Sequence, residues 1–235
     1  AEEHIKEVAG VLSSYCDLIA VRAFPQFKVW SYDKTDPFIT GLANYSSVPV
    51  INMETILHPC QELAFMMALQ SRLGCVKNKK LTITWTWHPK PLNTAVANSA
   101  LLIATRFGMD VTLLVPTENY MLDETFITQA RNNAQENGGQ VSLSHDIKSA
   151  YTGADAVYAK SWGALPFYGR PEEEWQLREQ YKHFIVDEEK MQLTNSAVFS
   201  HCLPLRRNVK ATDAVIDADY CMALEEAENR LHVQK

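Results

Sequence analysis

Apolar positions in this chain fall into short runs, separated by stretches with helical periodicity. The opening residues carry apolar side chains at close to helical spacing, and a short apolar run at 17–22 predicts a buried strand of a parallel sheet. A second buried strand is predicted at 48–52, with short helices at 27–32 and 38–43. A long helix follows residue 61 and ends at Gly74, because glycine commonly occupies the position after a helix.

From residue 76 onward, predicted strands and helices alternate. Strands that alternate with helices of ten or more residues indicate a parallel sheet covered on both faces. We therefore predict the α/β class, with two doubly wound parallel-sheet domains. Strands of the second domain are predicted at 81–85, 111–115, 141–143, 156–159 and 197–199, and helices at 93–107, 123–136, 147–151, 172–181 and 188–193. A last helix opens near residue 225.

Composition favours a small-molecule partner. Among 235 residues, 46% are hydrophobic and 21% charged, and the net charge is −6 without runs of like charge, so a nucleic acid or membrane surface has no electrostatic support as a partner. The longest apolar runs are far shorter than a membrane span, and the first residues lack a signal-peptide pattern.

An odd number of widely spaced cysteines without a Cys-x-x-Cys motif predicts reduced thiols in a cytoplasmic protein and no zinc site; they are Cys16, Cys60, Cys75, Cys202 and Cys221.

Functional groups are concentrated at residues 54–61, between the second strand and the long helix. Pro59 suits the first turn of a helix, and the free N–H groups of that turn favour an anion or a carbonyl oxygen. His58 can donate to a polarised oxygen, and the Gln61 amide suits a planar group that has both C=O and NH2. The alternative is that His-Pro simply caps the helix.

Further polar groups follow other predicted strands. Arg22 ends the first strand, and its side chain suits a phosphate or carboxylate, although a surface arginine is an equal alternative. Three clusters, at 85–93, 160–163 and 201–207, also lie just past strand ends. Each alone is typical of a loop, but cations and amides that follow four strands at the same sheet edge predict a binding site. The Gly-, Pro- and aromatic-rich connection at 160–171 is typical of a binding loop.

Two motifs resemble the carbamoyltransferase family, which includes the aspartate and ornithine enzymes: His-Pro-Cys-Gln at 58–61 and His-Cys-Leu-Pro at 201–204. Trp-His-Pro-Lys-Pro-Leu-Asn at 87–93, Tyr-Ala-Lys-Ser-Trp-Gly at 158–163 and Cys-Leu-Pro-Leu-Arg-Arg-Asn-Val-Lys at 202–210 resemble its N-acetylornithine branch. The resemblance covers essentially the whole chain. It implies transfer of a carbamoyl group from carbamoyl phosphate to the side-chain amine of N-acetyl-L-ornithine, giving N-acetyl-L-citrulline for arginine synthesis. It also implies domains at 1–75 (half of the carbamoyl-phosphate domain), 76–222 (acetylornithine-binding) and 223–235 (a helix returning to the first domain).

The resemblance assigns catalytic roles to several of these residues. Arg22 and His58 would donate to the carbonyl oxygen on which charge builds. Gln61 and the backbone carbonyls at 202–203 would accept from the carbamoyl NH2, and Arg206 would assist near the reacting groups. No dedicated base is evident for an amine whose free pKa is ~10, so the departing phosphate is the hypothetical proton acceptor. The implied carbamoyl phosphate site comprises Arg22, His58, Pro59, Cys60, Gln61, Cys202 and Leu203.

Substrate choice follows from charge. An acylated ornithine has lost its α-ammonium charge and kept its carboxylate, so a cation such as Lys160 suits it. In the corresponding loops, the family's ornithine enzymes have an acidic residue and a Ser-Met-Gly run instead. Lys210, near the arginines at 206–207, is a candidate for carboxylation by the same resemblance. Glu2 would reach a neighbouring subunit and favour acetyl over succinyl, with the N-succinylornithine enzyme as the alternative. The implied acetylornithine site comprises Glu54, His88, Asn93, Lys160, Leu203 and Glu2, with no cofactor and no metal.

The sequence departs from the family in one respect. The Ser-x-Arg-Thr phosphate motif and the aromatic loop that completes a neighbour's site do not occur in it. Both belong to the amino-terminal half of the family's first domain, so we expect that domain to be incomplete here and these residues to bind carbamoyl phosphate poorly. The full-length form is expected to be a homotrimer. A non-catalytic protein that binds acyl-amino acids is the alternative from another functional class.

Overall fold

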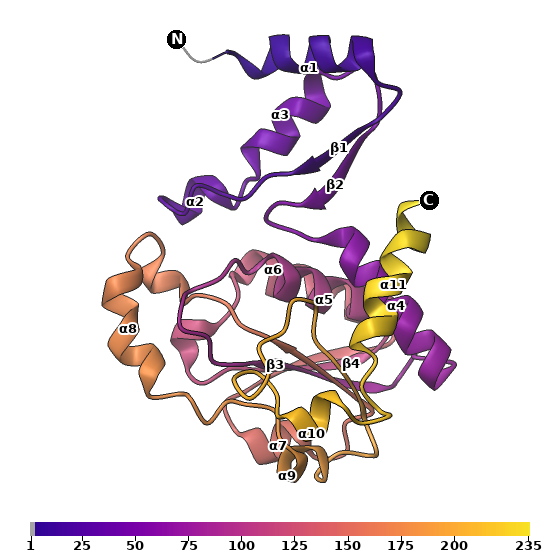
Figure 1. The fold of residues 1–235 in the computed structure, drawn as a ribbon, viewed down its shortest axis with the longest axis vertical. Coiled ribbons are helices and arrows are strands. Elements are labelled where there is room, and N and C mark those ends of the chain that lie inside the picture. Colours follow the sequence, from indigo (N-terminus) through magenta and orange to yellow (C-terminus); the bar gives the residue numbers. More distant parts are fainter. Residues whose placement is uncertain (1–2) are drawn as a thin grey trace.

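Two parallel sheets organise the computed structural model, which describes residues 3–235 (Figure 1). The smaller sheet pairs β1 (Ile19–Arg22) with β2 (Val50–Glu54), and both strands end on the same side. Three helices accompany it: α1 (Ile5–Tyr15), α2 (Trp30–Asp33) and α3 (Pro37–Tyr45). The α1 and α3 helices pack together, and their small core is formed by Ala9, Ile19, Val21 and Leu42.

The larger sheet has five parallel strands in the order β5-β4-β3-β6-β7. The chain runs outward from β3 to β5 and then returns to β6 on the other side of β3. Strand order therefore reverses between β3 and β6, and open α/β sheets bind ligands beyond the carboxyl ends of the strands at such a point. The strands are β3 (Lys80–Trp85), β4 (Asp110–Leu114), β5 (Gln140–Ser144), β6 (Ala156–Lys160) and β7 (Val198–Ser200).

Helices cover both faces of the larger sheet, as the doubly wound prediction requires. Figure 1 shows α5 (Ala95–Arg106) and α6 (Glu124–Asn137) on one side of β3 and β4, and α7 (Ile147–Tyr151), α9 (Glu188–Met191) and α10 (Asp213–Ile216) on the other. The α8 helix (Pro171–Glu179) lies at one end of the sheet. Within residues 3–235, no helix combines the length and apolar character needed to cross a bilayer.

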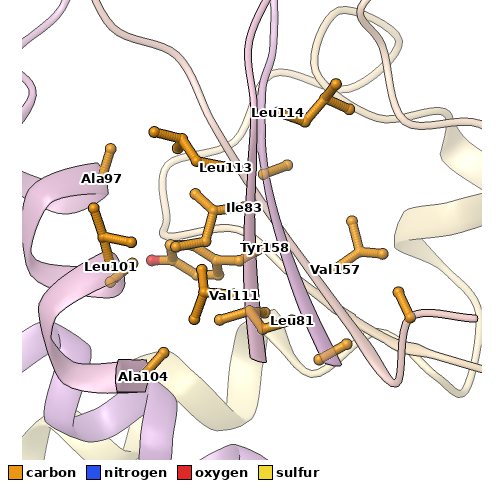
Figure 2. Close-up of a cluster of buried hydrophobic side chains, with 14 of the residues drawn as sticks. Leu81, Ile83, Ala97, Leu101, Ala104, Val111, Leu113, Leu114, Val157 and Tyr158 are labelled. Atoms are coloured by element: carbon orange, nitrogen blue, oxygen red, sulfur yellow. The ribbon is translucent and has the colours of Figure 1, made fainter. Parts of the chain in front are cut away.

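The main core lies between the larger sheet and its helices (Figure 2). Side chains of β3 and β4 meet those of α5, and each fully buried Leu or Ile contributes roughly 1.5–3 kcal/mol relative to exposure. Both faces of these strands are buried, as expected for a parallel sheet covered by helices. The labelled members of this cluster are Leu81, Ile83, Ala97, Leu101, Ala104, Val111, Leu113, Leu114, Val157 and Tyr158.

Two helices and a few polar contacts join the two units. The α4 helix (Pro59–Leu73) continues from β2 and packs along α11 (Ala223–Gln234) and against α5. Trp30 Nε1 donates to Asp123 Oδ2 at 2.6 Å, and Tyr168 Oη donates to Asp33 Oδ2 at 2.8 Å. The division of the chain at residues 75 and 222 stays a prediction.

Local differences from the predicted elements have simple causes. The helix predicted at 27–32 is the single turn α2, because Phe27 has a left-handed φ of 56° that a helix cannot contain. The second strand lies at Val50–Glu54, two residues later than predicted. Three short elements were not predicted; they are α10 and the 3₁₀ turns Glu118–Tyr120 and Leu165–Phe167.

Candidate active site

A cavity of about 380 Å³ lies where the carboxyl ends of strands from both sheets meet. Most residues that the sequence singled out line it, from β1, β2, β6 and the loops after β3 and β7. The lining contains five basic side chains (Arg22, Lys160, Arg206, Lys210 and Arg230) against one carboxylate, Glu54. The remaining lining residues are His58, Gln61, His88, Leu92, Val96, Cys202, Leu203 and Pro204.

The smaller sheet places three of these side chains side by side. Arg22 and Glu54 end the adjacent parallel strands, and Arg22 Nε donates to Glu54 Oε2 at 2.9 Å. His58 Nε2 lies 3.5 Å from the same carboxylate oxygen. Glu54 therefore orients both the arginine and the imidazole toward the cavity. The Arg22 side chain is 64% exposed, so its charge remains partly hydrated.

His58 is a neutral imidazole at physiological pH. Burial, together with the nearby cations Arg230, Arg22 and Lys160, lowers its pKa to about 3. The contact with Glu54 is therefore not an ion pair at neutral pH. His58 is the N-cap of α4, but its side chain does not cap the helix, and its backbone N–H donates to Ser99 Oγ at 2.7 Å. The imidazole thus remains available to a bound molecule.

Gln61 is held by residues of the last helix. Its Nε2 donates to Glu226 Oε1 at 2.9 Å, and its Oε1 accepts from Arg230 Nη1 at 3.3 Å. Sequence reasoning missed Arg230, although it lines the same cavity. The local pattern offered no signal, because an arginine in an amphipathic terminal helix is usually a solvent-facing residue.

The switch point of the larger sheet supplies the opposite wall. Lys160 ends β6, and its Nζ lies 3.5 Å from Cys202 Sγ in the loop after β7. His88 lies in the loop after β3, where its Nδ1 contacts the backbone of Lys90. Burial lowers the pKa of His88, which keeps this ring neutral as well.

Lys210 is a buried amine between other cations. Only 3% of the residue is exposed, and burial, with Lys160 and Arg206 nearby, lowers its pKa to about 7. A large share of Lys210 is consequently uncharged at neutral pH, and a neutral amine is nucleophilic. Arg206, by contrast, is an exposed cation at the rim of the cavity.

Three of the predicted site residues that the structure describes lie outside the cavity lining: Pro59, Cys60 and Asn93. Pro59 is the first residue of α4, and Cys60 points its Sγ toward Asn52 O at 3.7 Å. Asn93 joins the two units: its Nδ2 donates to Thr55 O at 2.8 Å and its Oδ1 accepts from the Ala95 N–H. Glu2 lies outside the described residues, so its position is not tested.

A second cavity of about 280 Å³ adjoins the first and shares only Leu92 with it. It is mostly apolar, and the loop at 163–171 forms one wall, which places the predicted binding loop beside the site. Among the described residues, no cluster of three His, Cys, Asp or Glu side chains could hold a metal ion.

The arrangement suits a small anion with a polarised carbonyl group. Surplus positive charge in a partly closed cavity attracts an anionic ligand. Neutral imidazoles and amide groups add hydrogen bonds without further charge. Such fixed donors can stabilise an oxygen on which negative charge develops.

Both parts of the chain match family models. Residues 1–71 match the aspartate/ornithine carbamoyltransferase carbamoyl-P binding domain, and residues 79–235 match the aspartate/ornithine carbamoyltransferase Asp/Orn binding domain.

Individual proteins are also similar over the whole chain. The chain is 66% identical over 236 residues to the N-acetylornithine carbamoyltransferase of Xanthomonas campestris pv. campestris, covering 100% of this chain and 70% of that protein. A crystal structure of acetylornithine transcarbamylase complexed with acetylcitrulline is 66% identical, with a TM-score of 0.98 over 100% of this chain and 71% of the other. A mutant N-acetyl-L-ornithine transcarbamylase complexed with carbamyl phosphate and N-succinyl-L-norvaline is 65% identical, with a TM-score of 0.98 and the same coverage.

Proposed function

The chain belongs to the aspartate/ornithine carbamoyltransferase family, and we propose that it transfers the carbamoyl group of carbamoyl phosphate to the side-chain amine of N-acetyl-L-ornithine. The products are N-acetyl-L-citrulline and phosphate, and the reaction serves arginine biosynthesis. The observation that carries the proposal is the single cavity where cationic, imidazole and amide groups from both sheets meet.

The carbamoyl donor is proposed to bind between the two units. Arg22 and His58 would donate to the carbonyl oxygen, where negative charge builds as the amine attacks. A neutral His58 can do so, since one ring nitrogen always carries a proton. Gln61 Oε1 and the backbone carbonyls at 202–203 would accept from the NH2 group, while Arg230 adds positive charge beside the phosphate.

The acceptor amine must be neutral when it attacks. A free alkyl amine has a pKa of ~10, and a surplus of neighbouring cations lowers that pKa by disfavouring the ammonium form. As the new C–N bond forms and the C–O bond to phosphate breaks, the amine loses a proton. The departing phosphate would take that proton, because His58, held neutral by its surroundings, is a weak base.

Lys160 would recognise the carboxylate of the acylated ornithine, with Glu54, His88 and Leu203 lining the same cavity. Asn93 would act indirectly, since it joins Thr55 O to the start of α5. A carboxylated Lys210 would become an anion paired with the neighbouring cations, and its lowered pKa favours the neutral amine that captures CO2. Homotrimer formation and a cytoplasmic location are also part of the proposal, and the five free cysteines support the latter.

The test is product formation. The full-length protein is incubated with carbamoyl phosphate and N-acetyl-L-ornithine, and acetylcitrulline is measured by mass spectrometry, with ornithine and N-succinyl-L-ornithine in parallel. We expect acetylornithine to be the preferred acceptor. Preference for succinylornithine would contradict the acceptor assignment, and binding without any turnover would favour the non-catalytic alternative.

A further inference from the structure

A cluster of buried acids lies directly behind Gln61. Glu62 is 0% exposed and Glu226 is 1% exposed, and they come from α4 and α11, the two helices that run side by side in Figure 1. Tyr158 of β6 lies between them, with its Oη 3.2 Å from Glu62 Oε1 and 3.1 Å from Glu226 Oε1. None of these three residues lines the cavity, so the proposed chemistry leaves them without a role.

The two acids differ in their partners. Glu226 accepts hydrogen bonds from Gln61 Nε2, Tyr158 Oη and Ser200 Oγ, whereas Glu62 has only the Tyr158 contact, and its Oε2 has no partner among the described residues. Burial raises the pKa of both, that of Glu226 to about 7 and that of Glu62 well above its usual range. Glu62 therefore keeps its proton, whereas Glu226, which three donors stabilise, ionises first and carries the negative charge at mildly alkaline pH.

These contacts decide which way round the Gln61 amide lies. A carboxylate can only accept hydrogen bonds and a guanidinium can only donate them. Turning the amide over would place Gln61 Oε1 against the Glu226 carboxylate and Gln61 Nε2 against Arg230. Both new contacts would be repulsive, so the observed orientation is the favoured one.

We infer that Glu226 is a positioning residue, which holds the Gln61 amide so that its oxygen faces the bound donor and accepts from the carbamoyl NH2. A Gln61 side chain without this constraint could present its own NH2 group instead. The site would then no longer reject a donor that lacks an NH2 group. Such a donor is rejected only when the Gln61 oxygen is fixed in place and would be left without a hydrogen-bond donor. The inference rests on the proposed function and adds a determinant of donor specificity to it.

Acetyl phosphate tests this directly, because its methyl group replaces the NH2 of carbamoyl phosphate. The full-length protein is compared with Glu226→Gln and with Glu225→Gln, an exposed neighbour that pairs with Arg72 outside the cavity. For each we measure the inhibition constant of acetyl phosphate, the dissociation constant of carbamoyl phosphate, kcat, and KM for acetylornithine, at mildly alkaline pH.

The expected result is a fall of about fivefold to tenfold in preference for carbamoyl over acetyl phosphate in Glu226→Gln, the size of one lost hydrogen bond. The value of kcat should fall about tenfold, while KM for acetylornithine stays within about twofold and Glu225→Gln matches the wild type. In a Gln61→Met background, Glu226→Gln should change the preference by less than about twofold, since the oriented group is already gone.

Retention of wild-type preference and kcat in a folded Glu226→Gln protein would overturn the inference. If that variant fails to fold, Glu226→Asp replaces it, because the shorter side chain keeps the charge and withdraws the carboxylate from Gln61. The same loss of preference is expected, and wild-type preference would again refute the role. Absence of acetylcitrulline from the wild type would instead refute the proposed function, so the two failures are distinguishable.

Discussion

The buried ion pair of α8 should be a main determinant of stability. Glu174 and Arg178 are one helical turn apart, their side chains are each 1% exposed, and Arg178 Nη2 donates to Glu174 Oε1. Glu174 Oε1 also accepts from the Ala164 N–H at 3.1 Å, and the Arg178 guanidinium reaches the carbonyl oxygens of His88 and Trp162. The pair therefore holds both the loop after β3 and the loop after β6.

Replacing Arg178 with Met leaves the Glu174 carboxylate buried without its counter-charge. Removing one partner of a buried pair typically costs about 3–5 kcal/mol, and full burial leaves little solvent screening to reduce that cost. For a chain of this size, each kcal/mol corresponds to about 2–4 °C in Tm, so the expected decrease in Tm is roughly 6–20 °C. The double variant Arg178→Met/Glu174→Gln should recover at least half, because it removes the uncompensated charge.

Thermal unfolding and urea titration measure these changes. The matched control is Arg131→Met, which breaks an exposed pair with Glu124 on α6 and should cost less than about 1 kcal/mol. Equal losses in Arg178→Met and Arg131→Met would refute the reasoning, as would a double variant no more stable than the single one.

Further predictions concern the site itself. Lys160→Met should raise KM for acetylornithine at least about tenfold, because a charge-assisted hydrogen bond is lost, and leave the affinity for carbamoyl phosphate, measured by calorimetry, nearly unchanged. His58→Ala should lower kcat about 10²–10³-fold, the decrease expected for a lost oxyanion donor, with little change in KM for either substrate. An unchanged kcat in steady-state kinetics would contradict this role of His58. The pKa of His58 is about 3 in the folded protein and near 6.5 in the unfolded chain. Between these pH values the unfolded chain binds one more proton than the folded protein, so the free energy of unfolding decreases as the pH falls from 6.5 to 3. Urea titrations across this range should show a smaller decrease for His58→Gln. Isotope-labelled CO2 should give a carbamate signal in NMR spectra of the wild type that Lys210→Arg lacks.

Much of the fold was readable from local pattern. Strands such as β3 and β4 are short, largely apolar segments with no solvent-exposed face. Helices such as α6 begin after an N-cap aspartate and end at a left-handed glycine, so the type of each element can be predicted from its own residues. Candidate site residues were readable for a related reason. The carboxyl ends of parallel strands lie at the same edge of a sheet. Arg22 and Lys160, which end such strands, were therefore expected at that edge of their sheets.

Contacts between distant segments were decided only by the tertiary structure. In the sequence, Arg230 cannot be distinguished from a solvent-facing helix residue. The packing of α11 along α4 brings it into contact with Gln61, 169 positions away. The lowered pKa of Lys210 and the raised pKa of Glu226 likewise depend on burial and on neighbours from other elements. A sequence thus determines which side chains follow each strand, because backbone periodicity is local, whereas charge state and orientation depend on desolvation by residues that only folding brings near.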